Sequence, residues 1–140
     1  MLWSDMYKTG SPSVDGQHME IFEMVRELQE IDLSANDVRE RLEQALEFLS
    51  AYAVRHFSNE ETLMLQSNYS GYAMHKSQHD TFVVDLVRVM RQNGAANDMP
   101  RLVSEITAFA SSWLKEHIAS SDKHMATHYR EWEANKLDIL

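Results

Sequence analysis

The chain has 140 residues, of which 44% are hydrophobic, so it is long enough for one domain with a substantial apolar core. Its formal net charge of -9 disfavours nucleic acid and anionic membrane surfaces as partners, because both require a basic face. It has no cysteine, which excludes disulfides and thiolate metal sites, and no signal peptide or apolar membrane span. We therefore expect a single cytoplasmic domain over residues 1–140 that does not contact the membrane.

The first element predicted in the chain is an irregular N-terminal arm over residues 1–14. Gly10 and Pro12 interrupt any continuous helix there. Helical periodicity begins at Asp15, a suitable N-cap, and apolar residues then recur at steps of three and four. This pattern predicts a first helix over about 16–31.

A second helix is predicted over about 37–65, with an inner face that continues without interruption. That face consists of Val38, Leu42, Ala45, Leu49, Tyr52, His56, Glu60 and Leu63. A turn at 66–72 separates it from a third helix over about 73–91, whose inner stripe includes His75 and His79.

A fourth helix is predicted to begin near Pro100, after a loop at 93–100. Its inner face consists of Leu102, Ile106, Phe109, Trp113 and His117. The helical pattern then continues past Asp122 as a charged, weakly striped and therefore solvent-exposed extension over 123–140. Four helices with short connections predict an all-α, up-down-up-down four-helix bundle.

Histidine recurs on the inner faces of all four predicted helices. Residues four apart lie on one face of a helix, so His56 with Glu60, and His75 with His79, can each aim two ligand atoms at one point. A carboxylate on a core-facing stripe needs a partner, because an unpaired buried charge costs several kcal/mol. The inward-facing candidates for metal ligation are His18, His56, Glu60, His75, His79, His117 and Asp122.

The last two candidates are five residues apart, which is a rotation of about 140° away from the starting face in a regular helix. For His117 and Asp122 to reach one site, the helix must bulge or break between them, and single-turn π-bulges often occur at functional sites. Imidazoles with carboxylates suit iron, manganese or zinc better than calcium or magnesium. The set is too large for one tetrahedral zinc and fits two metals bridged by the carboxylates.

From Trp3 to about Asp122 the chain resembles the hemerythrins, in particular their bacterial branch. The resemblance rests on Val14-Asp15-Gly16-Gln17-His18, His56-Phe57-x-x-Glu60-Glu61, His75-x-x-x-His79, and Trp113-Leu114-x-x-His117-Ile118 with Asp122. It implies a non-haem di-iron centre in the bundle core. The implied arrangement is His75, His79 and His117 on one iron, His18 and His56 on the other, and Glu60 and Asp122 bridging both.

The resemblance also implies an oxo or hydroxo bridge from solvent, so that the first iron has six ligands and the second has one open octahedral position. The resemblance implies that dioxygen binds there, takes one electron from each ferrous ion and the proton of the hydroxo bridge to become a bound hydroperoxide, and gives both electrons and the proton back on release. A dry pocket keeps this reversible. Candidates to line it, each equally compatible with an ordinary core role, are Ile21, Phe57, Leu114 and Ile118.

Several neighbouring residues are assigned to other roles. Trp113 is expected to pack behind the ligands, and Glu61 points about 100° away from Glu60, toward the surface or a supporting position. His124 and His128 are expected to be exposed helix residues rather than a second metal pair. Met125 stands where many hemerythrins carry an aromatic residue, so pocket shape and autoxidation rate do not follow from the resemblance.

The function predicted first is reversible dioxygen binding rather than enzymatic catalysis. It would serve oxygen carriage or storage in a free-standing domain, or oxygen and redox sensing with a signalling module attached beyond 123–140. The helix that continues past Asp122 favours sensing. A di-iron oxidase or peroxidase is the alternative, disfavoured because five histidines outnumber two carboxylates. Iron storage or nitric oxide handling at the same open site is a third possibility.

Overall fold

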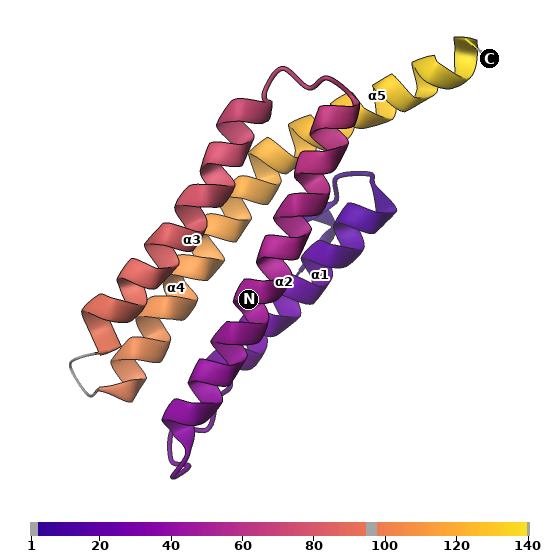
Figure 1. Cartoon of the computed structure of the whole chain (residues 1–140). Helices are drawn as coiled ribbons and strands as arrows, with labels where there is room; N and C mark the ends of the chain where they lie inside the picture. Colours follow the sequence, from indigo (N-terminus) through magenta and orange to yellow (C-terminus); the bar gives the residue numbers. More distant parts are fainter. Residues whose placement is uncertain (1–2, 95–97, 140) are drawn as a thin grey trace.

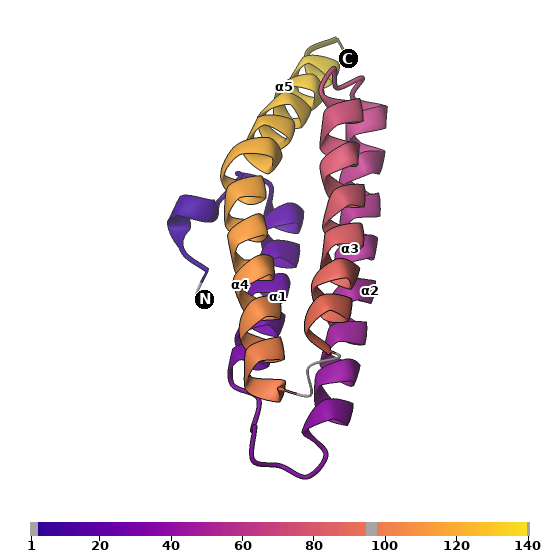
Figure 2. The ribbon, with the colours of Figure 1, turned by 90° about the vertical axis from the view of Figure 1, so that its left-hand side faces the viewer.

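A computed structural model describes residues 3–94 and 98–139 of the chain. Its α-helices are α1 (Pro12–Gln29), α2 (Val38–Gln66), α3 (Tyr72–Gly94), α4 (Met99–His117) and α5 (Lys123–Ile139). Helices α1 to α4 run alternately up and down and lie side by side as a bundle, from which α5 projects at one end (Figures 1 and 2). The predicted all-α bundle is confirmed, and the described residues contain no strand. None of the helices in these ranges is both long and apolar enough to cross a membrane.

Helix α1 begins earlier than predicted, and the irregular arm is correspondingly shorter than residues 1–14. Pro12 lies in the first turn of the helix, where its fixed φ is favourable and its missing N–H is not needed. Asp15 is therefore not the N-cap, which is Ser11. Instead, one carboxylate oxygen of Asp15 accepts hydrogen bonds of 2.8 Å from both the backbone N–H and the hydroxyl of Thr9. This contact fastens the arm to the helix that carries His18.

The arm also packs against the distant helix α5 through Gly10, whose φ of 91° is in the left-handed region. A Cβ at this position would overlap the guanidinium of Arg130. We expect Gly10→Ala to lower the free energy of unfolding by about 1–3 kcal/mol, measured by urea denaturation. Gly16→Ala is the control, because Gly16 is inside α1 with open space around it and should gain about 0.5–1 kcal/mol. Equal effects of the two substitutions would contradict this account of the arm.

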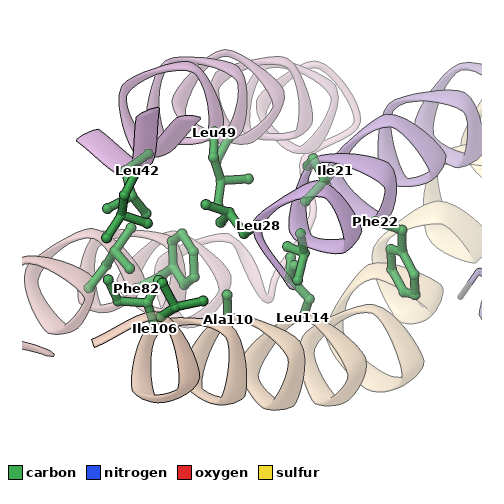
Figure 3. Close-up of a cluster of buried hydrophobic side chains, with 14 of the residues drawn as sticks. Ile21, Phe22, Leu28, Leu42, Leu49, Phe82, Ile106, Ala110 and Leu114 are labelled. Atoms are coloured by element: carbon green, nitrogen blue, oxygen red, sulfur yellow. The ribbon is translucent and has the colours of Figure 1, made fainter. Parts of the chain in front are cut away.

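The main apolar core fills the half of the bundle next to the α1–α2 connection. Figure 3 shows side chains from all four bundle helices meeting there: Ile21, Phe22 and Leu28 of α1, Leu42 and Leu49 of α2, Phe82 of α3, and Ile106, Ala110 and Leu114 of α4. A smaller cluster at the opposite end joins Val14, Met64 and Met125. The predicted ligands lie between these two apolar layers along their helices, which keeps bulk water away from both ends of the site.

The buried face of α2 is wider than the single stripe that was predicted. The residues of that stripe that are only half-buried are Val38, Ala45, Tyr52 and Leu63, whereas Leu46, Ala53, Phe57 and Met64 are buried. The physical reason is that α2 contacts both α1 and α3, so residues on either side of the stripe are covered.

The C-terminal extension is not solvent-exposed along its whole length as predicted. Met125 and Ala126, in the first turn of α5, are at most 2% exposed. The helix leaves the bundle only after this turn (Figure 1), and most of residues 130–136 are exposed. The beginning of α5 is therefore a structural part of the bundle that carries the site.

Candidate metal centre

All seven predicted ligands are buried and converge between the four bundle helices. None of them is more than 5% exposed, although every one is polar or charged: His18, His56, Glu60, His75, His79, His117 and Asp122. Their ligand atoms form two groups, in each of which all atoms lie within 4.8 Å of one another. One group contains His75, His79 and His117, the other contains His18 and His56, and both include Glu60 and Asp122.

Each of the two carboxylates presents one oxygen to each group. Oε1 of Glu60 lies 3.0 Å from Nε2 of His79, while Oε2 lies 3.3 Å from Nε2 of His56. Oδ1 of Asp122 lies 3.0 Å from Nε2 of His117, while Oδ2 lies 2.9 Å from Nε2 of His18. This division of oxygens is what two carboxylates need in order to bridge two cations.

A π-helical segment at Ile118–Asp122 places the last two ligands together. It separates α4 from α5 and widens the turn, so that His117 and Asp122 face the same point although they are five residues apart. The bulge predicted from this spacing is confirmed. Without it, a regular helix would turn Asp122 about 140° from the face of His117.

The imidazole nitrogens and carboxylate oxygens at the centre are suitable ligands for metal cations. The inward-facing Nε2 atoms of His18, His56 and His75 and all four carboxylate oxygens have no hydrogen-bond partner among the described residues. Buried polar groups without partners are costly, and two carboxylates surrounded by imidazoles are instead the ligands that iron prefers. The residues present therefore fit the pair of cations that the sequence motifs imply.

Three of the histidines are oriented by a residue on the preceding helix. Gln17 of α1 accepts a hydrogen bond of 2.6 Å from Nδ1–H of His56 on α2, and Glu61 of α2 accepts one of 2.9 Å from His79 on α3. Gln78 of α3 does the same for His117 of α4, at 2.8 Å. Holding the proton on Nδ1 leaves the Nε2 lone pair free to face the centre. Each supporting residue is the chain neighbour of a predicted ligand.

Negative charge dominates the centre. Burial by itself lowers the pKa of His18 and of His75, but the close carboxylates of Asp122 and Glu60 outweigh it and raise both pKa values to about 9. Burial also opposes ionisation of Glu60, yet its histidine neighbours, His56 first, hold its pKa well below the usual range. The centre thus binds protons when no other cation neutralises the two carboxylates.

Metal loading should therefore release protons from this centre. Below about pH 9 the histidines at 18 and 75 are protonated in the metal-free chain, whereas a metal ligand must be neutral. We expect about two protons to be released per chain when ferrous iron binds at pH 7, and the apparent affinity to fall as the pH drops from 9 to 6. Anaerobic calorimetry in two buffers of different ionisation enthalpy measures this release. An affinity that does not change over that range would contradict it.

Comparison with known proteins places the chain in a family. The sequence profile of the family described as "Hemerythrin HHE cation binding domain" matches residues 9–129. The chain belongs to the hemerythrin family. Its relatives include a bacteriohemerythrin of Methylococcus capsulatus, which is 32% identical over 124 residues that cover 88% of this chain and 92% of the relative. The family resemblance predicted from the motifs is confirmed.

Other hemerythrins are similarly related to the chain. A bacteriohemerythrin of Pseudomonas aeruginosa is 30% identical over 87% of this chain and 76% of the relative. A myohemerythrin of Sipunculus nudus is 31% identical over 86% of this chain and 87% of the relative. No solved structure gives a significant match. Family membership confirms the predicted class of function, which is dioxygen binding with two iron ions at a non-haem centre.

The four residues predicted to line the dioxygen pocket of this hemerythrin are all buried in the main core cluster: Ile21, Phe57, Leu114 and Ile118. Phe57 lies on the three-histidine side, where its ring stacks on His79 at 4.0 Å between centroids and 8° between planes. Trp113 packs behind the ligands as expected, stacked on His117 at 4.4 Å. The lining role itself stays a prediction.

Only one of the two histidines on α5 agrees with the prediction that both are exposed. His124 is exposed as expected. His128 is half-buried, and its Nε2–H donates a hydrogen bond of 2.8 Å to the carbonyl of Ser67, while its ring packs against Tyr69. The prediction that His128 is exposed is therefore wrong. The side chain instead ties α5 to the turn between α2 and α3.

Proposed function

We propose that this hemerythrin binds dioxygen reversibly at two iron ions, and that each of the two groups of ligand atoms holds one of them. His75, His79 and His117 would hold one iron, His18 and His56 would hold the other, and Glu60 and Asp122 would contribute an oxygen to each. The observation that carries the proposal is that each carboxylate directs one oxygen to each histidine group. The two-histidine side is one ligand short of the three-histidine side, and this is the side assigned to dioxygen.

The protein residues position the two irons, neutralise their charge and exclude water from them. When bound, two ferrous ions supply the two electrons that dioxygen takes up and returns. Glu60 and Asp122, both 0% exposed, would neutralise the paired cations. Ile21, Leu114 and Ile118, each at most 1% exposed, exclude the water and protons that would make the electron transfer irreversible.

The stoichiometry of dioxygen uptake tests this proposal. Ferrous protein prepared without oxygen is injected into an oxygen-electrode cell, and we expect about one dioxygen per chain that holds two irons. His56→Ala should prevent the uptake, whereas His124→Ala, on the exposed face of α5, should not change it. Uptake by the first variant equal to that of the native chain would contradict the assignment of dioxygen to the two-histidine side.

An oxygen carrier and a di-iron oxidase or peroxidase differ in what they do with a reductant. The centre holds five histidines and two carboxylates, and this ligand set favours binding over activation of dioxygen in our proposal. We expect no sustained consumption of hydrogen peroxide when iron-loaded protein is mixed with peroxide and ascorbate. Steady turnover at a constant rate would favour the enzyme instead.

A sensing role is supported by the continuity of the helix that carries the bridging aspartate. The chain runs from α4 through the π-helical segment into α5 without a break, and Met125 lies fully buried three residues after Asp122. A change at the centre can thus reach the projecting part of α5. We expect amide hydrogen exchange in α5 to differ between oxygen-bound and oxygen-free protein. Identical exchange in the two forms would favour oxygen carriage or storage. For either role we propose a cytoplasmic location.

A further inference from the structure

Gln78 on α3 contacts both ends of the π-helical segment. Its Oε1 accepts one hydrogen bond of 2.8 Å from Nδ1–H of His117, the residue before the segment. The same oxygen accepts another of 2.7 Å from the hydroxyl of Ser121, the residue before Asp122. A carbonyl oxygen has two lone pairs, and both are used here. One amide oxygen therefore holds the predicted ligand His117 and the residue next to the predicted ligand Asp122.

The contact between Gln78 and Ser121 also lies between two surface hollows. One has a volume of about 250 Å³ and reaches His117, and the other has a volume of about 120 Å³ and reaches His75. Both are lined by Gln78 and Ser121, so this hydrogen-bonded pair lies between the two hollows. His117 and His75 line these hollows, yet they are only 5% and 3% exposed.

Gln78 differs from the two other residues that orient histidines, because it makes a second hydrogen bond to the π-helical segment. The side chain of Gln17 is hydrogen-bonded to His56. Glu61 is hydrogen-bonded to His79, and its other carboxylate oxygen faces solvent and Lys76. Only for Gln78 does the support of a histidine coincide with a second bond, to the segment that carries a carboxylate ligand. The π-helical segment needs such an anchor, because its wide turn is intrinsically less stable than an α-helical turn.

We propose that Gln78 is a positioning residue that clamps the π-helical segment onto α3. It fixes the tautomer of His117, holds Asp122 in its bridging position through Ser121, and closes the solvent route to the three-histidine side. The proposal rests on the proposed function, since the clamp acts on groups assigned as iron ligands. The clamp slows both the loss of iron and the entry of water.

Adjacent serines provide a matched pair of variants. Ser121 makes the bond to Gln78, whereas the hydroxyl of exposed Ser120 donates to the carbonyl of Glu116 in its own helix. We expect Ser121→Ala to release ferrous iron to a chelator about tenfold faster than the native chain, with faster amide exchange at residues 118–122. Ser120→Ala should stay within about twofold of native in both measurements. Equal release rates for the two variants would overturn the proposal.

Substitutions of Gln78 separate the clamp from ordinary packing. Gln78→Leu removes the acceptor and should weaken iron binding by about 10- to 100-fold. Gln78→Glu keeps an acceptor, so it should retain both irons and shift the reduction potential downward, because a carboxylate makes His117 a stronger donor. Equal losses in both variants, without a shift in potential, would overturn the proposal.

The native chain distinguishes failure of this proposal from failure of the proposed function. If the native chain takes up two irons and the serine variants behave alike, only the clamp is wrong. If the native chain takes up no iron, the proposed function fails and the clamp fails with it.

Discussion

Glu60→Gln is expected to reduce iron loading from about two ions per chain to fewer than one. The substitution keeps the size of the side chain but removes the charge and one of the two oxygens that bridge the histidine groups. Without that charge, the positive charge of two ferrous ions is opposed by Asp122 alone in a fully buried site. The measurement is the iron-to-protein ratio after anaerobic loading and gel filtration.

Glu61→Gln is the matched control for this prediction. Glu61 is the next residue in the chain, its side chain is 20% exposed, and it contacts the centre only through Nδ1 of His79. A glutamine can accept the same hydrogen bond, so both irons should bind, with an affinity lowered by at most about tenfold. If Glu60→Gln also loads two irons, the bridging assignment is wrong.

Phe57→Ala is expected to lower the free energy of unfolding of the metal-free chain by about 3–5 kcal/mol. The Phe57 ring is 4% exposed and packs against the rings of His79, Phe82 and Trp113, so its removal leaves a cavity beside the centre. A surface hollow of about 270 Å³ already reaches Phe57 and His79 from outside. The same substitution should therefore also speed autoxidation of the oxygen-bound protein, because water gains access.

Phe48→Ala is the control for the stability change. Phe48 lies on the same helix, but its side chain is 61% exposed, so its removal should change the free energy of unfolding by no more than about 0.5 kcal/mol. Urea denaturation monitored by circular dichroism measures both variants at one pH. Similar losses of unfolding free energy in the two variants would show that the packing of Phe57 against the ligands does not stabilise the bundle.

The bundle and the convergence of the ligands follow from the periodicity of the sequence. Inward-facing residues recur at steps of three and four on each helix, and histidine recurs among them, so helix geometry alone brings ligands to one interior. The step of five from His117 to Asp122 is equally informative, because it conflicts with a regular helix and so predicts the π-helical segment. Helix geometry alone was therefore sufficient to predict the bundle, the convergence of the ligands and the π-helical segment.

Features that depend on contact between helices could not be read from spacing. Gln78 points about 100° away from its neighbour His79 on α3, and its partner is on α4, so only the packed structure reveals the clamp. His128 was predicted to be exposed for the same reason, since its partner Ser67 is 61 residues away in the chain. Pro12 shows a different limit, because a proline both interrupts helices and begins them.

The most direct test of the whole account is an optical cycle on a single sample. The chain is loaded with ferrous iron without oxygen, exposed to air, and then degassed, while its visible spectrum and iron content are recorded. We expect about two irons per chain and a coloured species that forms with oxygen and disappears on degassing over repeated cycles. A spectrum that becomes ferric on the first exposure and does not revert would contradict reversible dioxygen binding.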